Sequence, residues 1–129
     1  MAGLPRAGST LLSTLLNQNP RIYSGPSSPV LGAMYGIHED FQSNELYTGY
    51  PKPNQVNEII GSVIEHWYSD IDKPVVIDKN RAWCARVPFI EGYIKQEAKI
   101  IVPVRRIDEI LASILTMIKR NPFKEGQPR

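Results

Sequence analysis

With 129 residues, the chain is long enough to bury one real core and too short for two, so a single domain over residues 1–129 is expected. A lone cysteine, Cys84, excludes a disulfide framework and fits a reducing, cytoplasmic setting, and no apolar run reaches the roughly 18 residues of a membrane span. The net charge is only +2, but eleven of the fifteen bases fall in residues 79–129, which indicates a basic surface suited to a polyanion or simply to solvent.

Five segments show helical periodicity or helix-capping residues, and three short β-branched runs predict strands. The expected helices cover residues 9–17, 30–41, 56–68, 87–96 and 108–120, with Ser28 and Asp108 as two of the N-caps. The expected strands cover residues 22–23, 75–77 and 99–104, with a turn at 24–26, a surface loop at 42–53 and Cys84 in the core. Strands that alternate with helices imply parallel pairing, so the sequence predicts an α/β domain.

A glycine-rich loop precedes the first expected helix and reads Gly3-Leu4-Pro5-Arg6-Ala7-Gly8-Ser9-Thr10. Two glycines four residues apart, followed by a hydroxyl pair, have the spacing of a phosphate-binding loop, except that Ser9 stands where the lysine belongs. Backbone N–H groups of such a loop and of the helix start suit phosphate or sulfate, and Arg6 adds a cation. Without the lysine, ATP chemistry is disfavoured.

Two further cation-rich places follow expected strands, at residues 78–81 and at Arg105-Arg106. Ligands of parallel sheets bind beyond the carboxyl ends of the strands, where these places and the glycine-rich loop are expected to converge. The sequence therefore predicts a crevice for a ligand with several negative groups.

The loop, with its continuation through Asn19-Pro20 and Ser24-Gly25, resembles the 5′-phosphosulfate-binding loop of sulfotransferases, most closely the tyrosylprotein and bacterial branches. The segment from Lys99 to Ser113 is similar to the stretch that binds the 3′-phosphate of the donor in that superfamily. The resemblance implies a P-loop-like three-layer domain with a mainly parallel sheet, truncated at both ends. It also implies 3′-phosphoadenosine 5′-phosphosulfate as co-substrate, no metal, and a small-molecule or peptide acceptor with a hydroxyl or amine.

Carried over residue by residue, the resemblance assigns roles to the matching positions. Arg6 is the main leaving-group cation, Lys79 lies near the transferred sulfonate, and Arg105 with Ser113 binds the 3′-phosphate. The residues expected to bind the 5′-phosphosulfate are Arg6, Ala7, Gly8, Ser9 and Thr10.

The general base is the part of the pattern that this sequence lacks. Arg81 and Ser27 stand where the cytosolic and tyrosylprotein branches place a histidine and a glutamate. His38 and Glu39 are the nearest titratable candidates, with solvated helix residues as the alternative.

Other functions stay open. A nucleotide or small-molecule kinase would use Asp78 to hold Mg²⁺, and a non-catalytic nucleotide-binding module would need no base. Aromatic residues are sparse among the bases of residues 79–129, which disfavours a nucleic-acid surface, so no nucleic-acid partner is expected. The sequence specifies neither the acceptor nor the oligomeric state.

Overall fold

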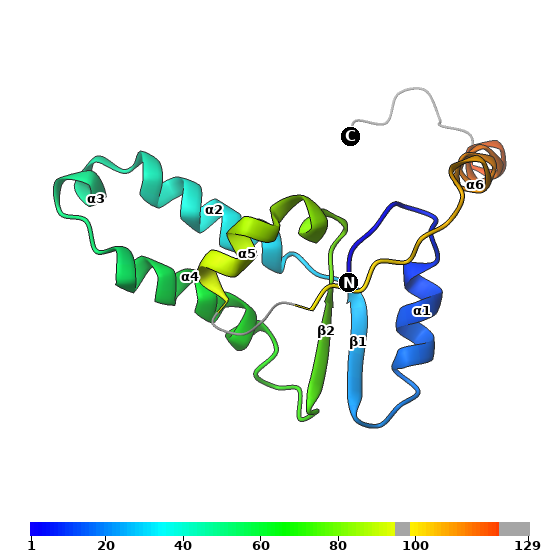
Figure 1. Ribbon diagram of the computed structural model, residues 1–129, viewed down its shortest axis with the longest axis horizontal. Coiled ribbons are helices and arrows are strands. Elements are labelled where there is room, and N and C mark those ends of the chain that lie inside the picture. Colours follow the sequence, from blue (N-terminus) through cyan, green and yellow to red (C-terminus); the bar gives the residue numbers. More distant parts are fainter. Residues whose placement is uncertain (95–98, 122–129) are drawn as a thin grey trace.

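Two parallel strands, β1 (Ile22–Ser27) and β2 (Val75–Lys79), lie side by side at the centre of the computed structural model, which describes residues 1–94 and 99–121 (Figure 1). Ile22 is opposite Val75, and the register shifts between Ser24 and Ser27. The predicted strands 22–23 and 75–77 match the first residues of β1 and β2, and both strands extend further than predicted. The mixture of helices with a parallel strand pair confirms the α/β class in this general form.

The described helices divide between the two sides of this strand pair (Figure 1). On the side of β2 lie α2 (Val30–Ser43), α3 (Glu45–Gly49), α4 (Pro53–Trp67), the 3₁₀ helix η1 (Arg81–Arg86) and α5 (Val87–Tyr93). On the side of β1 lie α1 (Ser9–Leu16) and α6 (Ile107–Arg120). None of the helices in the described ranges is long and apolar enough to cross a bilayer.

The hydrophobic core lies where α2, α4 and α5 meet. Its three fully buried large side chains are Met34, Ile60 and Val30. Most of the apolar stripe predicted for α4 packs in this core, whereas its members Ile59 and Trp67 are exposed. Gly61 of α4 approaches the next layer closely, because a Cβ atom there would lie 2.5 Å from the carbonyl oxygen of Tyr93. The strongest helical pattern of the sequence therefore forms the centre of the core, as expected for an amphipathic helix.

The segment 99–104 does not form the buried strand that its β-branched residues predict. It is a coil in which Ile100 packs against the core while most other side chains are exposed, and Val104 is 90% exposed. Pro103 offers no N–H to a ladder. A single backbone bond to Met1–Gly3 is present, from the Ala2 N–H to the Ile101 carbonyl at 3.0 Å.

Several smaller predictions also differ from the structure. The segment 24–26 belongs to β1 instead of a turn, and the predicted loop at 42–53 contains α3. Cys84 is exposed on η1 instead of buried. Pro29 directly precedes α2, but the Ser28 hydroxyl accepts from the Val30 N–H at 3.4 Å and also donates to Asp78. Arg106 precedes α6, and the predicted cap Asp108 lies in the first turn of that helix. The fourth predicted helix ends at Tyr93 as α5, and residues 95–96 of the prediction lie outside the described residues.

Candidate anion-binding site

The glycine-rich loop makes a sharp turn that uses three left-handed backbone positions. Gly3 and Gly8 have φ of 123° and 97°, a region in which side chains are strained and glycine is not. A Cβ atom on Gly3 would also lie 3.3 Å from the Pro103 carbonyl. The two glycines of the motif are therefore required by the turn itself.

Arg6 is the third left-handed residue, with φ of 65°, and it has a side chain. Such a conformation persists only where the surroundings hold it, and it is frequent at ligand sites. Arg105 supplies one holding contact, because its Nη1 donates to the Arg6 carbonyl at 3.3 Å. The strained arginine is thus tied to the segment that precedes α6.

A cavity of about 210 Å³ opens beside the loop. We call it the loop cavity, and its lining is Met1, Ala2, Gly3, Pro5, Arg6, Ser9, Thr10, Ser27, Lys79 and Arg81. Three of these side chains are cations and none is an acid. α1 begins at Ser9 without a side-chain cap, so its first N–H groups remain available beside the cavity. The arrangement suits an anion.

Lys79 is the most unusual of the three cations because it is only 8% exposed. No carboxylate in the described ranges forms an ion pair with it. A buried charge without a partner is costly, and an anion in the loop cavity would offset that cost. Lys79 therefore points to the sign of the ligand independently of the loop.

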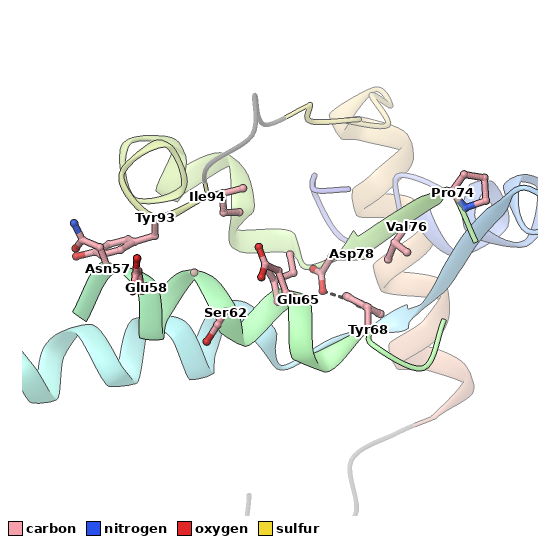
Figure 2. A pocket seen from close by; sticks show the side chains of 12 residues that line it. Asn57, Glu58, Ser62, Glu65, Tyr68, Pro74, Val76, Asp78, Tyr93 and Ile94 are labelled. Carbon is pink, nitrogen blue, oxygen red and sulfur yellow. Dashed lines mark hydrogen bonds between the residues drawn. The ribbon is translucent and has the colours of Figure 1, made fainter. Parts of the chain in front are cut away.

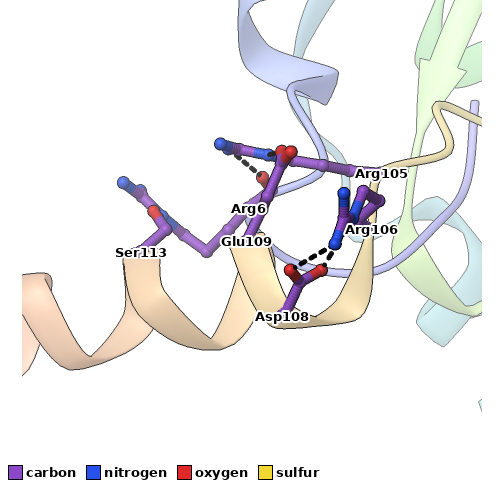
Figure 3. Close-up of polar contacts among 6 residues, drawn as sticks. All are labelled: Arg6, Arg105, Arg106, Asp108, Glu109 and Ser113. Carbon is purple, nitrogen blue, oxygen red and sulfur yellow. Dashed lines mark hydrogen bonds and ion pairs between the residues drawn. The ribbon is translucent and has the colours of Figure 1, made fainter.

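Arg6 also contacts the predicted 3′-phosphate residues, which are 99 and 107 positions away (Figure 3). Its Nε donates to the Ser113 hydroxyl oxygen at 2.9 Å. Arg105 forms an ion pair at 2.8 Å with Glu109, which lies in the first turn of α6. Arg6, Arg105 and Ser113 thus form one cluster in the folded chain.

Arg106 lies outside this cluster. It pairs with Asp108 at 2.8 Å, and both side chains are well exposed. Among the described bonds, Arg106 has no contact with Arg6.

The other residues predicted to bind the 5′-phosphosulfate differ in whether they line the loop cavity. Ser9 and Thr10 line the loop cavity, whereas Ala7 and Gly8 do not. The Ala7 N–H donates to the Leu4 carbonyl at 3.3 Å, and Gly8 is the cap residue of α1. Ala7 and Gly8 therefore shape the loop.

His38 and Glu39 lie on α2. They line neither the loop cavity nor the neighbouring cavity between α1 and β1. The His38 ring packs against Tyr35 and Phe89, and its Nδ1 lies 2.6 Å from the Tyr93 hydroxyl oxygen. Glu39 is exposed. The structure does not bring these two residues to the cations, and their role as base stays a prediction.

Asp78 joins three elements behind the loop cavity, a role that the sequence did not reveal. Its buried carboxylate accepts hydrogen bonds from the Trp83 indole at 2.6 Å, from the Tyr68 hydroxyl at 2.8 Å and from the Ser28 hydroxyl. These bonds fix the end of β2, and with it Lys79, to α4, η1 and the start of α2. Burial, and then the bond to Asp78, raise the pKa of Tyr68 well above its usual value.

Asp78 also borders a cavity of about 580 Å³ between α4, β2 and the end of α5 (Figure 2). Glu58 and Glu65 line it together with Asp78. Alternate residues of a strand face opposite sides, so Asp78 faces this acidic cavity while Lys79 faces the loop cavity. An anionic ligand is favoured only on the Lys79 side.

A second cavity of about 580 Å³ lies next to the loop cavity, between α1 and β1. We call it the α1–β1 cleft, and its lining is Thr10, Ser13, Thr14, Asn17, Gln18, Tyr23, Ser24, Gly25, Pro26 and Lys79. Thr10 and Lys79 line both cavities. Residues from α1 and the turn after it line this cleft together with residues 23–26, and no local pattern in the sequence indicates that pairing.

Comparison of the chain with protein-family models, curated proteins and solved structures gave no match.

Proposed function

We propose that this protein is a sulfotransferase, which binds 3′-phosphoadenosine 5′-phosphosulfate and transfers its sulfonate group to a hydroxyl or amine acceptor. The observation that carries the proposal is the hydrogen bond from Arg6 Nε to Ser113 Oγ, at 2.9 Å. It joins the loop expected to bind the 5′-phosphosulfate with the pair expected to bind the 3′-phosphate. A nucleotide with phosphates at both ends would explain why these distant motifs lie together.

The same proposal includes the fold in its finer form, a P-loop-like three-layer domain. Support comes from Met1, which donates to the Asp78 carbonyl and whose carbonyl accepts from the Asn80 N–H at 3.0 Å. Ala2 bonds Ile101 on the other side. The residues before the loop thus lie between β2 and the segment 99–104, where a central strand of such a sheet would run.

In the proposed reaction, the acceptor atom forms a bond to sulfur as the bond from sulfur to the 5′-phosphate oxygen breaks. The departing phosphate keeps the electron pair, and the acceptor proton passes to a base. Arg6 and Lys79 both line the loop cavity and would stabilise the negative charge that grows on the leaving oxygen. One preorganised donor of this kind typically lowers a barrier by about 3 to 4 kcal/mol.

The base remains the open element of the proposal. Arg81 and Ser27 line the loop cavity where related enzymes carry titratable groups, and neither is an ordinary base. His38 and Glu39 remain the candidates from the sequence. Donor binding without turnover is therefore the property to test first.

The two alternative functions make different demands. A kinase would need the Asp78 carboxylate free for Mg²⁺, but three hydrogen-bond donors already occupy it. A non-catalytic nucleotide-binding module would bind the same donor and differ only in lacking turnover. The geometry thus favours the sulfated donor over ATP.

Calorimetric titration with 3′-phosphoadenosine 5′-phosphate, and with ATP in the presence of Mg²⁺, tests the proposal. We expect the bisphosphate to bind without metal and more tightly than ATP. Arg6→Ala should weaken it, whereas the matched change Arg21→Ala, at an exposed arginine outside both cavities, should not. Preferential binding of ATP with Mg²⁺ would support the kinase instead.

A further inference from the structure

The α1–β1 cleft meets the loop cavity at two shared residues, Thr10 and Lys79. A group transferred in line must have its donor on one side and its acceptor on the other. If the donor lies in the loop cavity, the neighbouring space that also contacts Lys79 is the place from which an acceptor can approach. The cleft has this position, and its volume of about 580 Å³ lies within the usual range of small-molecule sites.

The lining of the cleft has a distinct chemistry. It is rich in hydroxyl and amide side chains, which come from α1 and from the start of β1. Lys79, at the junction, is its one charged residue, and Pro26 is its one purely aliphatic side chain. Groups that both donate and accept hydrogen bonds suit a ligand with many hydroxyl groups.

Two side chains of the cleft have hydrogen-bonding capacity to spare. Ser24 is only 4% exposed, and its Oγ has no hydrogen-bond partner in the described part of the chain. Gln18 is exposed, and no described residue bonds its side-chain amide. A buried hydroxyl without a partner is unfavourable, and Ser24 therefore adds an unpaired hydroxyl at the wall of the cleft.

We propose that the α1–β1 cleft is the acceptor site and that it takes an uncharged, polyhydroxylated molecule such as a saccharide. This inference rests on the proposed function and adds the substrate class to it. An acidic tyrosine peptide would find one cation in the cleft, and a lipid alcohol would find one aliphatic side chain, Pro26. Tyr23 adds an aromatic side chain on which the apolar face of a sugar ring can pack.

Saturation-transfer NMR with three neutral trisaccharides of glucose, galactose and mannose tests the inference. Each is titrated against the full chain with and without 3′-phosphoadenosine 5′-phosphate. Sulfated donor is omitted, so that binding is measured without turnover. A tyrosine-containing acidic peptide and 4-nitrophenol serve as probes of the two other acceptor classes.

We expect at least one trisaccharide to bind, and Gln18→Ala to weaken it about three- to ten-fold, as for the loss of one neutral hydrogen bond. Gln42→Ala, the same change at an exposed glutamine of α2, should leave binding unchanged. Ser24→Ala should weaken the saccharide without lowering the melting temperature, because its hydroxyl has no partner to lose.

Failure of all three trisaccharides, equal effects of Gln18→Ala and Gln42→Ala, or Gln18-dependent binding of the peptide or the phenol would overturn the inference. If nucleotide binding is normal, such a result contradicts only the assignment of a saccharide as the acceptor. Loss of nucleotide binding removes the proposed function, and the saccharide titration without nucleotide still decides what the cleft binds.

Discussion

The two sides of the strand pair differ in how they are held together. On the side of α2, α4 and α5, apolar residues interlock around Met34 and Ile60. On the side of α1 and α6, only Ser13 and Ile110 are buried within the helices, and leucines of both helices are more than half exposed. The core side supplies stability, and the other side holds Arg6, Arg105 and the cleft. Lys79 and Arg81 reach the loop cavity from the end of β2 and the start of η1.

This separation has a physical reason. Charged and polar groups that must contact a ligand cannot also be covered by apolar neighbours, because a buried charge without a partner is costly. Lys79 and Asp78 show the division within two consecutive residues, since one faces the loop cavity and the other is tied into the core side. Changes on the core side should therefore alter stability, and changes on the α1–α6 side should alter binding.

The largest effect is expected in the core. Ile60→Ala should lower the free energy of unfolding by about 2 to 5 kcal/mol, because the side chain is fully buried and a cavity would remain. Ile59→Ala, the same change at the neighbouring half-exposed residue of α4, should cost much less. Urea denaturation measures both variants, and equal losses would contradict the position assigned to the core.

The next effect is on binding. Arg105→Ala should weaken 3′-phosphoadenosine 5′-phosphate by about 1.5 to 3 kcal/mol, the worth of a hydrogen bond to a charged group, and should barely alter unfolding. AMP, which lacks the 3′-phosphate, should lose far less. Arg106→Ala is the matched control, because Arg106 pairs only with the exposed Asp108 among the described contacts. Calorimetry that gave equal losses for both nucleotides would count against a 3′-phosphate site.

A smaller effect on stability is expected from loss of the hydrogen bond between Asp78 and Tyr68, the residue that follows α4. Tyr68→Phe should lower stability by about 1 kcal/mol at neutral pH, since Asp78 keeps two other donors. The native pKa of Tyr68 is raised above that of the unfolded chain, so this contribution is present below about pH 10 and is lost as the pH rises further.

The difference between wild type and Tyr68→Phe should therefore narrow above pH 10. Chemical denaturation at a series of pH values measures it. Tyr50→Phe, at an exposed tyrosine, is the control and should show no such narrowing. A constant difference across the series would mean that the Tyr68 hydroxyl contributes nothing through Asp78.

The smallest expected effect is an increase in nucleotide affinity. Glu109 holds the Arg105 guanidinium in an ion pair that a bound 3′-phosphate would have to replace. Exposed pairs of this kind are worth about 0.2 to 1 kcal/mol, so Glu109→Gln should tighten nucleotide binding by up to about five-fold. Asp108→Asn, which frees only Arg106, should not. Weaker binding by Glu109→Gln would show that the carboxylate supports the site instead of competing for it.

The sequence by itself determined the elements that depend on local chemistry. The apolar period of α4, the β-branched start of β2 and the glycines of the loop each specify a conformation through neighbouring residues alone. The resemblance also placed Arg6, Arg105 and Ser113 at one donor site. The structure joins the three residues by hydrogen bonds, and their role in binding a donor stays a prediction.

Only the tertiary structure decided what depends on partners far along the chain. The segment 99–104 has the composition of a strand, but Pro103 lacks the N–H for a ladder, and in the described chain only Ile100 of its apolar β-branched residues packs against the core. Ser28 was predicted only as a cap, but its hydroxyl also donates to Asp78, which is 50 residues away. The α1–β1 cleft forms where Gln18, in the turn after α1, lies near Ser24 of β1, and no local pattern in the sequence encodes this packing. Local periodicity specifies which residues face inward, whereas the contacts that form a site are set by long-range packing.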